Sequence, residues 1–314
     1  EDIEDKNIFN PKEYGVAFKV TKDLSLKYPD QVFNTPISEA AISGISSGYV
    51  LAGGKAILEI MFGDFTTLIF DQLLQHASKF EDMYAGKINC PLIVRTPMGG
   101  RRGYGPTHSQ SLEKFFLGIP NLSVVALNHR ISPNYVYSHI ISNFKNPCLV
   151  IENKILYTVE NKKEMLTGYN YSFKQNSETL PSLFICSKDY DSELTILCYG
   201  GSLIEIEKVV EKLCIEDEIF VDILCPSIIS EISLDDLFSS IQRTRKLLIV
   251  EEGHNFASWS SEVIAKISEK QLNLDSVTRI SNNEIIPSSF QAELNILPSV
   301  DKIYKTALKI VEND

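Results

Sequence analysis

The chain contains six apolar runs of strand length, separated by stretches long enough to form helices. Each run is nearly continuous in Val, Ile and Leu, and most are bounded by Gly or Pro. Such runs are typical of parallel strands that are buried on both faces of a sheet. The runs are PLIVRTP (91–97), LSVVALN (122–128), PCLVIEN (147–153), LTILCYG (194–200), IFVDILC (219–225) and LLIVEEG (247–253).

Segments with helical periodicity lie between these runs. Apolar residues recur every three or four positions over 68–84 and over 204–217, which predicts amphipathic helices there. The alternation of strands and helices predicts an α/β fold with two doubly wound domains and mostly parallel sheets. The apolar runs stop between about 155 and 192 and restart at Leu194. We therefore expect a linker there, between a larger domain over 1–180 and a smaller domain over 190–314.

Composition narrows the classes of function. The chain of 314 residues is longer than the usual compact domain, and 44% of its residues are hydrophobic. The net charge of -11, with scattered Lys and Arg, argues against binding to nucleic acid or to an anionic membrane. No apolar run approaches the roughly 20 residues that span a bilayer. The six cysteines are far apart and form no CxxC pair. We expect reduced thiols, in the cytoplasm of a bacterium or in an organelle matrix.

One candidate for chemistry is Glu39, which lies in a stretch of small and apolar residues over 34–65. A carboxylate there is expected to be desolvated, so that it could share or donate a proton near neutral pH. The alternative is a plain acid at a helix N-terminus, because Thr35, Pro36 and Ser38 are helix start signals. The motifs GxSxG, GxxxxGK[ST], HExxH and strand-linked GxGxxG are absent from the sequence.

A second candidate is His108, in a glycine-rich, basic loop over 95–117. In α/β folds the loops after strands hold the sites, and a histidine there can act as acid or base. His108 could equally cap the next helix. Arg101 and Arg102 could attract an anionic substrate or be solvated. A third cluster over 250–263, with two acids and a histidine, could be a site or a loop that packs against a partner chain.

Several motifs occur in a fixed order along the chain: EDI (1–3), VAFKVTKDL (16–24), NTPISEAAISG (34–44), FGDF (62–65), DQL (71–73), PLIVRTPMGG (91–100), THSQS (107–111), GIPNLSVV (118–125), NPCLVIENKILY (146–157), LTILCYG (194–200) and RTRKLLIVEEG (243–253). This ordered set resembles the beta subunit of the first component of 2-oxo-acid dehydrogenase complexes, as in the pyruvate, branched-chain and acetoin enzymes. The resemblance is weaker beyond residue 253.

The resemblance implies a thiamine-diphosphate pyrimidine-binding domain followed by a transketolase C-terminal-like domain. In this family the glutamate of the TPISE motif, here Glu39, hydrogen-bonds the aminopyrimidine ring and activates the cofactor for decarboxylation and acyl transfer to a lipoyl arm. The resemblance assigns Phe65 to stacking on that ring, Ile37 and Met61 to the walls of its pocket, and His108 to proton transfer or to orienting the intermediate. Together with the small and apolar residues around Glu39, the resemblance favours the catalytic role of this residue over the capping role.

The resemblance also implies partners. The family's diphosphate motif, GDG followed by an Asn-containing segment that holds Mg2+, is absent from the sequence. We therefore expect an alpha-type subunit or a fused upstream domain to hold the diphosphate and Mg2+, and the beta part to self-associate. A lipoyl acyltransferase would be a further partner and a 2-oxo acid the substrate. The segment over 141–147 resembles a loop that binds a structural K+ through carbonyl oxygens.

Two alternatives stay open. One is a carboligating transferase resembling transketolase or deoxyxylulose-phosphate synthase, and the other is a non-catalytic scaffold subunit. Thr107 stands where relatives commonly have Gln, and with the two loop arginines it leaves the identity of the 2-oxo acid open.

Overall fold

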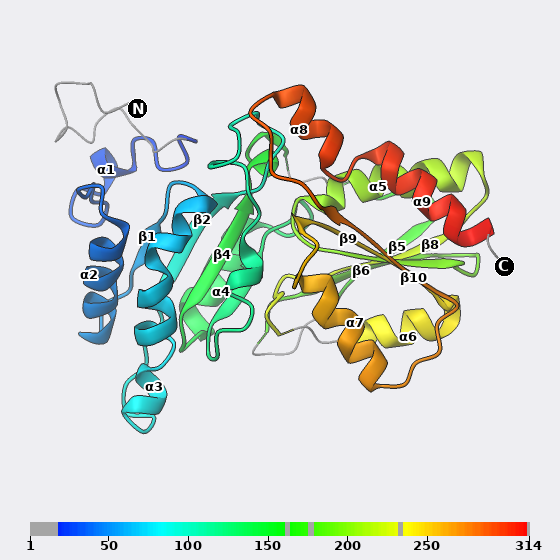
Figure 1. Ribbon diagram of the computed structural model, residues 1–314. Helices are drawn as coiled ribbons and strands as arrows, with labels where there is room; N and C mark the ends of the chain where they lie inside the picture. Colours follow the sequence, from blue (N-terminus) through cyan, green and yellow to red (C-terminus); the bar gives the residue numbers. More distant parts are fainter. Residues whose placement is uncertain (1–17, 161–163, 175–178, 232–234, 313–314) are drawn as a thin grey trace.

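The computed structural model describes residues 18–160, 164–174, 179–231 and 235–312, which form two sheets with their helices (Figure 1). The EDI motif (1–3) and the first two residues of VAFKVTKDL (16–24) lie outside the described residues. A short helix, α1 (Leu24–Lys27), precedes sheet A in the chain. No helix in the described part of the chain is long and apolar enough to cross a membrane.

Sheet A contains four parallel strands in the order β1-β2-β4-β3. They are β1 (Ile57–Glu59), β2 (Ile93–Met98), β3 (Ser123–Ala126) and β4 (Cys148–Asn153). The three strands expected in this region are confirmed, and β1 is an addition. One face packs on α4 (Pro133–Asn143), and the other packs on the segments around Leu73 and Phe116. Because both faces are covered, the strands are apolar at nearly every position.

Sheet B contains six strands in the order β10-β9-β7-β8-β6-β5. The expected strands at 194–200, 219–225 and 247–253 are confirmed as β7 (Leu194–Cys198), β8 (Val221–Cys225) and β9 (Lys246–His254), and β10 (Ser276–Asn282) is parallel to β9. The helices α5 (Ser202–Glu216) and α9 (Val300–Glu312) lie on one face, and α6 (Asp235–Thr244) and α7 (Trp259–Glu269) lie on the other (Figure 1). The α/β class with two doubly wound units is thus confirmed.

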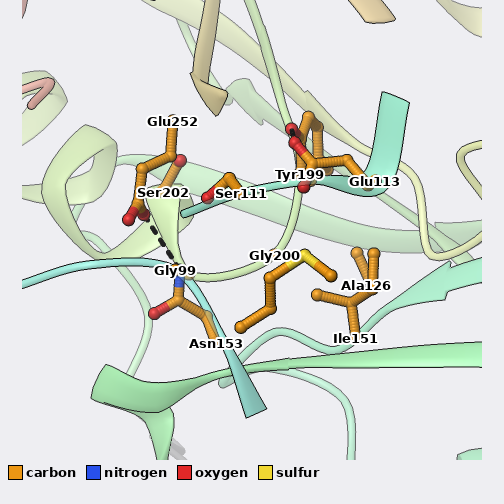
Figure 2. Close-up of a pocket in the computed structure, with 12 residues that line it drawn as sticks. Gly99, Ser111, Glu113, Ala126, Ile151, Asn153, Tyr199, Gly200, Ser202 and Glu252 are labelled. Atoms are coloured by element: carbon orange, nitrogen blue, oxygen red, sulfur yellow. Dashed lines mark hydrogen bonds between the residues drawn. The ribbon is translucent and has the colours of Figure 1, made fainter. Parts of the chain in front are cut away.

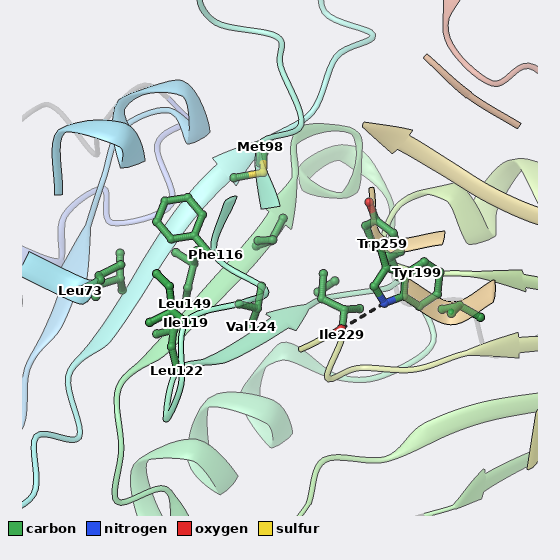
Figure 3. Packing of buried hydrophobic residues seen from close by; sticks show 14 of the residues in the cluster. Leu73, Met98, Phe116, Ile119, Leu122, Val124, Leu149, Tyr199, Ile229 and Trp259 are labelled. Atoms are coloured by element: carbon green, nitrogen blue, oxygen red, sulfur yellow. Dashed lines mark hydrogen bonds between the residues drawn. The ribbon is translucent and has the colours of Figure 1, made fainter. Parts of the chain in front are cut away.

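The two units share one hydrophobic core. Trp259 and Tyr199 of the second unit belong to the same buried cluster as Phe116 and Val124 of the first (Figure 3). The indole nitrogen of Trp259 donates to the carbonyl of Ile229 at 3.1 Å. The segment around Ile229 also pairs with β3, because its amide donates to the carbonyl of Val124 at 2.9 Å. Sheet A is therefore continued at its β3 edge by backbone of the second unit.

The expectation of a strand-free linker over 155–192 is wrong. This segment contains β5 (Tyr169–Lys174) and β6 (Ser182–Ser187), an antiparallel hairpin that extends sheet B. The hairpin was not predicted because the prediction rested on continuous apolar runs. Its first strand, YNYSFK, instead alternates aromatic and polar residues and is half-exposed at the sheet edge. The limits of 1–180 and 190–314 for the two domains stay a prediction, although a boundary ahead of Tyr169 would keep sheet B whole.

The helix expected over 68–84 is irregular, whereas the helix expected over 204–217 is confirmed as α5. A 3-10 helix, η1 (Gly63–Ile69), leads into a π-helical turn, η2 (Gln72–Ala77), and a short α3 (Phe80–Met83). Within η1, two threonine hydroxyls bond to backbone carbonyls. Thr66 Oγ1 donates to the carbonyl of Gly63 at 2.5 Å and Thr67 Oγ1 to that of Asp64 at 2.9 Å. Such local bonds compete with regular helix bonding.

Candidate cofactor-binding site

The predicted site residues come from one edge of sheet A. The four strands are parallel, so the segments that follow β1, β2 and β4 all leave at their carboxyl ends. Met61 and Phe65 follow β1, and His108 lies in the loop after β2. A short turn joins α2 (Glu39–Leu51) to β1, so that the beginning of α2 points back toward the same edge (Figure 1). This edge is where open α/β sheets bind ligands.

Glu39 is the first residue of α2, as the helix start signals predicted, with Ser38 as N-cap. Its side chain is half-buried, and its carboxylate has no hydrogen bond or ion pair with any described residue. The described residues therefore desolvate this carboxylate only in part. A further molecule would have to complete the burial of Glu39.

Phe65 and His108 lie in contact. The centroids of the two rings are 5.2 Å apart, and both rings also contact Phe62, at 5.9 Å from Phe65 and 4.8 Å from His108. All three contacts are edge-to-face, the arrangement that aromatic quadrupoles favour. The structure thus joins the FGDF and HSQ motifs, which are far apart in the sequence. Phe62 was not predicted as a site residue, although it begins one of these motifs.

Hydrogen bonds reinforce this junction. The amide of Gln110 donates to Asp64 Oδ1 at 2.8 Å, and Thr107 Oγ1 lies 2.9 Å from His108 Nδ1. Asp64 Oδ2 and Ser109 Oγ are buried without a hydrogen-bond partner among the described residues. Two unsatisfied polar atoms beside Phe65 and His108 suit a polar ligand or water at this place.

The side chains of Ile37 and Met61 are exposed. Their exposed fractions are 66% and 41%, which is high for side chains of their size. They lie on either side of α2, one just before the helix and the other just after β1. Their assignment to the pyrimidine pocket stays a prediction.

Lys154 is a residue that sequence reasoning missed, although it lies in the ENKILY motif. Its side chain is fully buried, and its Nζ donates to the carbonyl of Gly99 at 2.6 Å and to the carbonyl of His108. The ammonium lies 5.4 Å from the ring centroid of Phe62 and 5.6 Å from that of Tyr104. Burial lowers the pKa of Lys154 to about 8.

The loop after β2 is anchored to the second unit. Its backbone amides are held by two buried acids: Glu252 accepts from Gly100, and the two oxygens of Glu293 accept from Arg101 and Gly103, each at 2.7 Å. Glu293 lies in α8 (Phe290–Ile296) and is fully buried. A Cβ on Gly100 would lie 2.4 Å from Glu293 Oε1, which explains the glycine.

The side chains of the two loop arginines bind other parts of the chain. Arg101 donates to the carbonyl of Pro298 and lies 3.5 Å from Glu205. Arg102 donates to the carbonyl of Lys154 at 3.0 Å. The interpretation of solvated arginines is therefore corrected: they hold the loop against the rest of the chain, because each finds carbonyl or carboxylate oxygens within reach. Attraction of an anionic substrate stays a prediction.

The acids of the third cluster are also structural. Glu252 helps to line a small cavity between the two units, together with Gly99, Ser111, Glu113, Asn153 and Tyr199 (Figure 2). The cavity has room for about one water molecule. Glu113 accepts a hydrogen bond from the hydroxyl of Tyr199, and burial raises its pKa to about 7. Glu251 accepts from Ser260. The cluster therefore supports the contact between the units of this chain.

The segment proposed for K+ lies at the end of α4. Lys55 Nζ lies 3.5 Å from the carbonyl oxygen of Ile141, one of the carbonyls of that segment. Within the described ranges, no group of three or more His, Cys, Asp or Glu side chains could hold a metal ion. The expected K+ ligands are backbone carbonyl oxygens and not these side chains, so the K+ site stays a prediction.

Comparison with known proteins places this arrangement in a family. The family model described as "Transketolase, pyrimidine binding domain" matches residues 11–160, and that described as "Transketolase, C-terminal domain" matches residues 187–303. The pyruvate dehydrogenase E1 component subunit beta of Porphyra purpurea is 31% identical over 284 residues, which cover 90% of this chain and 82% of the relative. The chain belongs to the E1 beta subunit family of 2-oxo-acid dehydrogenases.

Other relatives of this E1 beta-type chain agree. The pyruvate dehydrogenase E1 component subunit beta-1, mitochondrial, of Arabidopsis thaliana is 28% identical and covers 94% of this chain and 80% of its own length. The acetoin:2,6-dichlorophenolindophenol oxidoreductase subunit beta of Bacillus subtilis is 29% identical, and the match covers 95% of this chain and 85% of the relative. A solved structure titled "Split gene transketolase, inactive beta4 tetramer" has a TM-score of 0.70 at 14% identity. The match covers 96% of this chain and 93% of that structure's chain, and it supports the fold.

The residues present fit the aminopyrimidine end of thiamine diphosphate, the cofactor of this family. A carboxylate, an aromatic ring and an imidazole stand at one sheet edge, and the carboxylate and two buried polar atoms there lack partners among the described residues. A carboxylate can bond the ring nitrogens, and an aromatic ring can stack on the flat heterocycle.

Proposed function

We propose that this chain is the beta-type subunit of a thiamine-diphosphate-dependent 2-oxo-acid dehydrogenase, an oxidoreductase that decarboxylates its substrate, and that it holds and activates the aminopyrimidine ring. The observation that supports the proposal best is the junction of FGDF with HSQ, which sets Phe65 against His108 at the sheet edge where Glu39 begins α2.

Each predicted residue has a role in this proposal. Glu39 shares its proton with a ring nitrogen, and Phe65 stacks on the ring. Ile37 and Met61 cover its sides once a partner closes over them, which accounts for their exposure in this chain. His108 orients the 2-oxo acid or moves a proton to it. When bound, the cofactor supplies the carbanion chemistry that makes loss of carbon dioxide feasible.

The half-exposed Glu39 and the exposed Ile37 and Met61 also support a partner. We propose an alpha-type subunit or fused upstream domain that binds the diphosphate through Mg2+, with two beta parts in the assembly. The names of the relatives, which include "subunit beta", agree with a complex of several subunits. A lipoyl acyltransferase and a structural K+ remain part of the proposal, as does a location in a bacterial cytoplasm or an organelle matrix.

The test is Glu39→Gln in the full assembly, with pyruvate as substrate and an artificial electron acceptor. A glutamine cannot take up the ring proton, so carbon dioxide release should fall by about 100-fold or more. The matched control is Glu262→Gln, because Glu262 also lies in the first turn of a helix, α7, and its side chain is 64% exposed. Near-normal turnover of the Glu39 variant, or an equal loss in both, would refute the proposal.

A further inference from the structure

Lys154 has a position that the proposed function leaves unexplained. Its fully buried Nζ donates to the carbonyls of Gly99 and His108, the two ends of the glycine-rich loop after β2. The described residues include no carboxylate in a salt bridge with it. A buried lysine without such a partner is costly, because the ammonium loses its hydration. Costly buried charges are found mostly where function requires them.

The loop that Lys154 closes has little stiffness of its own. Between its ends it contains Gly100, Gly103 and Gly105, and it begins at Gly99. The φ angles of Gly99, Gly103 and Gly105 are 92°, 74° and 82°, values that glycine adopts readily and other residues rarely. The amide of His108 donates to the carbonyl of Gly105 at 3.2 Å, and contacts from outside the loop must fix how this end lies against the sheet.

Lys154 supplies that contact from the neighbouring strand. It directly follows β4, and β4 pairs with β2 in parallel register. One ammonium thus joins the start of the loop, its end and the sheet. The bonds are assisted by charge, which makes them stronger than bonds between neutral groups.

A second connection runs through Phe62. Its ring centroid lies 5.4 Å from Lys154 Nζ and 4.8 Å from the centroid of the His108 ring. The ammonium is attracted to the electron-rich face of an aromatic ring. Lys154 therefore restrains His108 both through its backbone and through the ring against which its imidazole packs.

We propose that Lys154 is a positioning residue, which holds the imidazole of His108 in its working place by binding the carbonyl of His108 and the ring of Phe62. The inference rests on the proposed function, since it gives the held imidazole a role in the reaction. Lys154 itself touches neither substrate nor cofactor in this account.

The first test uses the isolated full chain and needs no turnover. The side-chain spectrum of a chain labelled with 15N reports on its five histidines, of which His108 is assigned through His108→Gln. Lys154→Met should shift or broaden the ring signals of His108. The matched control is Lys246→Met, because Lys246 is also buried and donates to a backbone carbonyl, that of Val311 at 2.9 Å, in the second unit. The control should leave the His108 signals in place.

The second test measures kinetics in the full assembly with pyruvate. Lys154→Met should lower kcat by about 10- to 100-fold, with a change in KM of about threefold at most. Lys154→Gln, which keeps a neutral donor and serves if the methionine variant does not fold, should lose less. Lys246→Met should lower the melting temperature and keep kcat.

Unchanged His108 signals in a folded Lys154 variant, or an unchanged kcat in an active assembly, would overturn the inference. If the wild-type assembly decarboxylates no 2-oxo acid, the proposed function fails, while the spectra still decide whether Lys154 holds His108.

Discussion

The hydroxyl oxygen of Thr107 lies 2.9 Å from Nδ1 of His108, the residue that follows it. A hydroxyl can donate to this nitrogen and so leave the proton of a neutral imidazole on Nε2. The other ring contacts of His108, with Phe62 and Phe65, are apolar and do not select a tautomer. Thr107 is thus the side chain that hydrogen-bonds Nδ1 of His108 and restrains the orientation of the ring.

Replacing Thr107 by Val should therefore lower kcat by about three- to tenfold, the usual effect of one hydrogen bond. The valine has nearly the same shape, so the backbone of the loop should not change. Thr107→Ser keeps the hydroxyl and should retain most of the activity. The measurement is turnover of the full assembly with pyruvate, and equal rates for the two variants would contradict this role of Thr107.

Phe65 offers a prediction about the cofactor. Phe65→Ala removes the ring proposed to stack on the aminopyrimidine, so the concentration of thiamine diphosphate for half-maximal turnover should rise by about tenfold. Phe65→Tyr keeps the flat ring and is the control. Half-saturation is measured by adding the cofactor to an assembly from which it has been removed. If Phe65→Ala saturates at the wild-type concentration, the ring does not stack on the cofactor.

The sequence motifs supplied candidate site residues, although Phe62 and Lys154 were missed within the FGDF and ENKILY motifs. Glu39, Phe65 and His108 follow from the resemblance, and the structure brings Phe65 and His108 into contact. Lys154 and Glu293 could not be found in this way. Their partners are backbone carbonyls and amides, which have no residue-specific signal, and Arg101 and Glu293 are 192 positions apart in the chain. Such contacts arise only from the packing of the two units.

The same limit applies to the fold. Buried parallel strands can be recognised because most of their positions are apolar: β7 (LTILC) and β8 (VDILC) each contain one polar residue. The β5–β6 hairpin is half-exposed, and its pattern is weaker. The hydroxyl bonds within η1 compete with regular helix bonding, and the spacing of apolar residues carries no sign of these bonds.

Glu293 should prove essential for the order of the loop. In Glu293→Gln one oxygen becomes an NH2 group, which cannot accept from the amides of Arg101 and Gly103. A buried amide then lacks its acceptor, which costs about 1–3 kcal/mol of folding free energy. We expect a lower melting temperature and faster hydrogen exchange at these two amides. Glu269→Gln, on the exposed end of α7, should change neither quantity. Unchanged exchange in the Glu293 variant would contradict the anchoring.

Glu113 should make the stability of the chain depend on pH. Its pKa is raised from 4.5 to about 7, because the carboxyl is fully buried and because Glu251 and Glu252 lie nearby. The folded chain therefore keeps this proton up to about pH 7, whereas the unfolded chain releases it near pH 4.5. Between these values the folded state binds more protons than the unfolded state. The contribution of Glu113 to the free energy of unfolding is therefore greatest at low pH and falls as the pH rises. The loss is at most about 1.4 kcal/mol per pH unit.

Glu113→Gln removes this proton equilibrium, and its carbonyl oxygen can still accept from the hydroxyl of Tyr199. Near pH 5 the variant and the wild type should melt at similar temperatures, because both then have a neutral side chain in the cavity. As the pH rises to 8 the wild type should lose stability relative to the variant, since only the wild type must bury a charge there. Melting temperatures of both proteins at unit steps from pH 5 to pH 8 give the difference directly. Parallel curves would mean that Glu113 is already ionised in the folded chain at pH 5, with its charge compensated by the groups around the cavity.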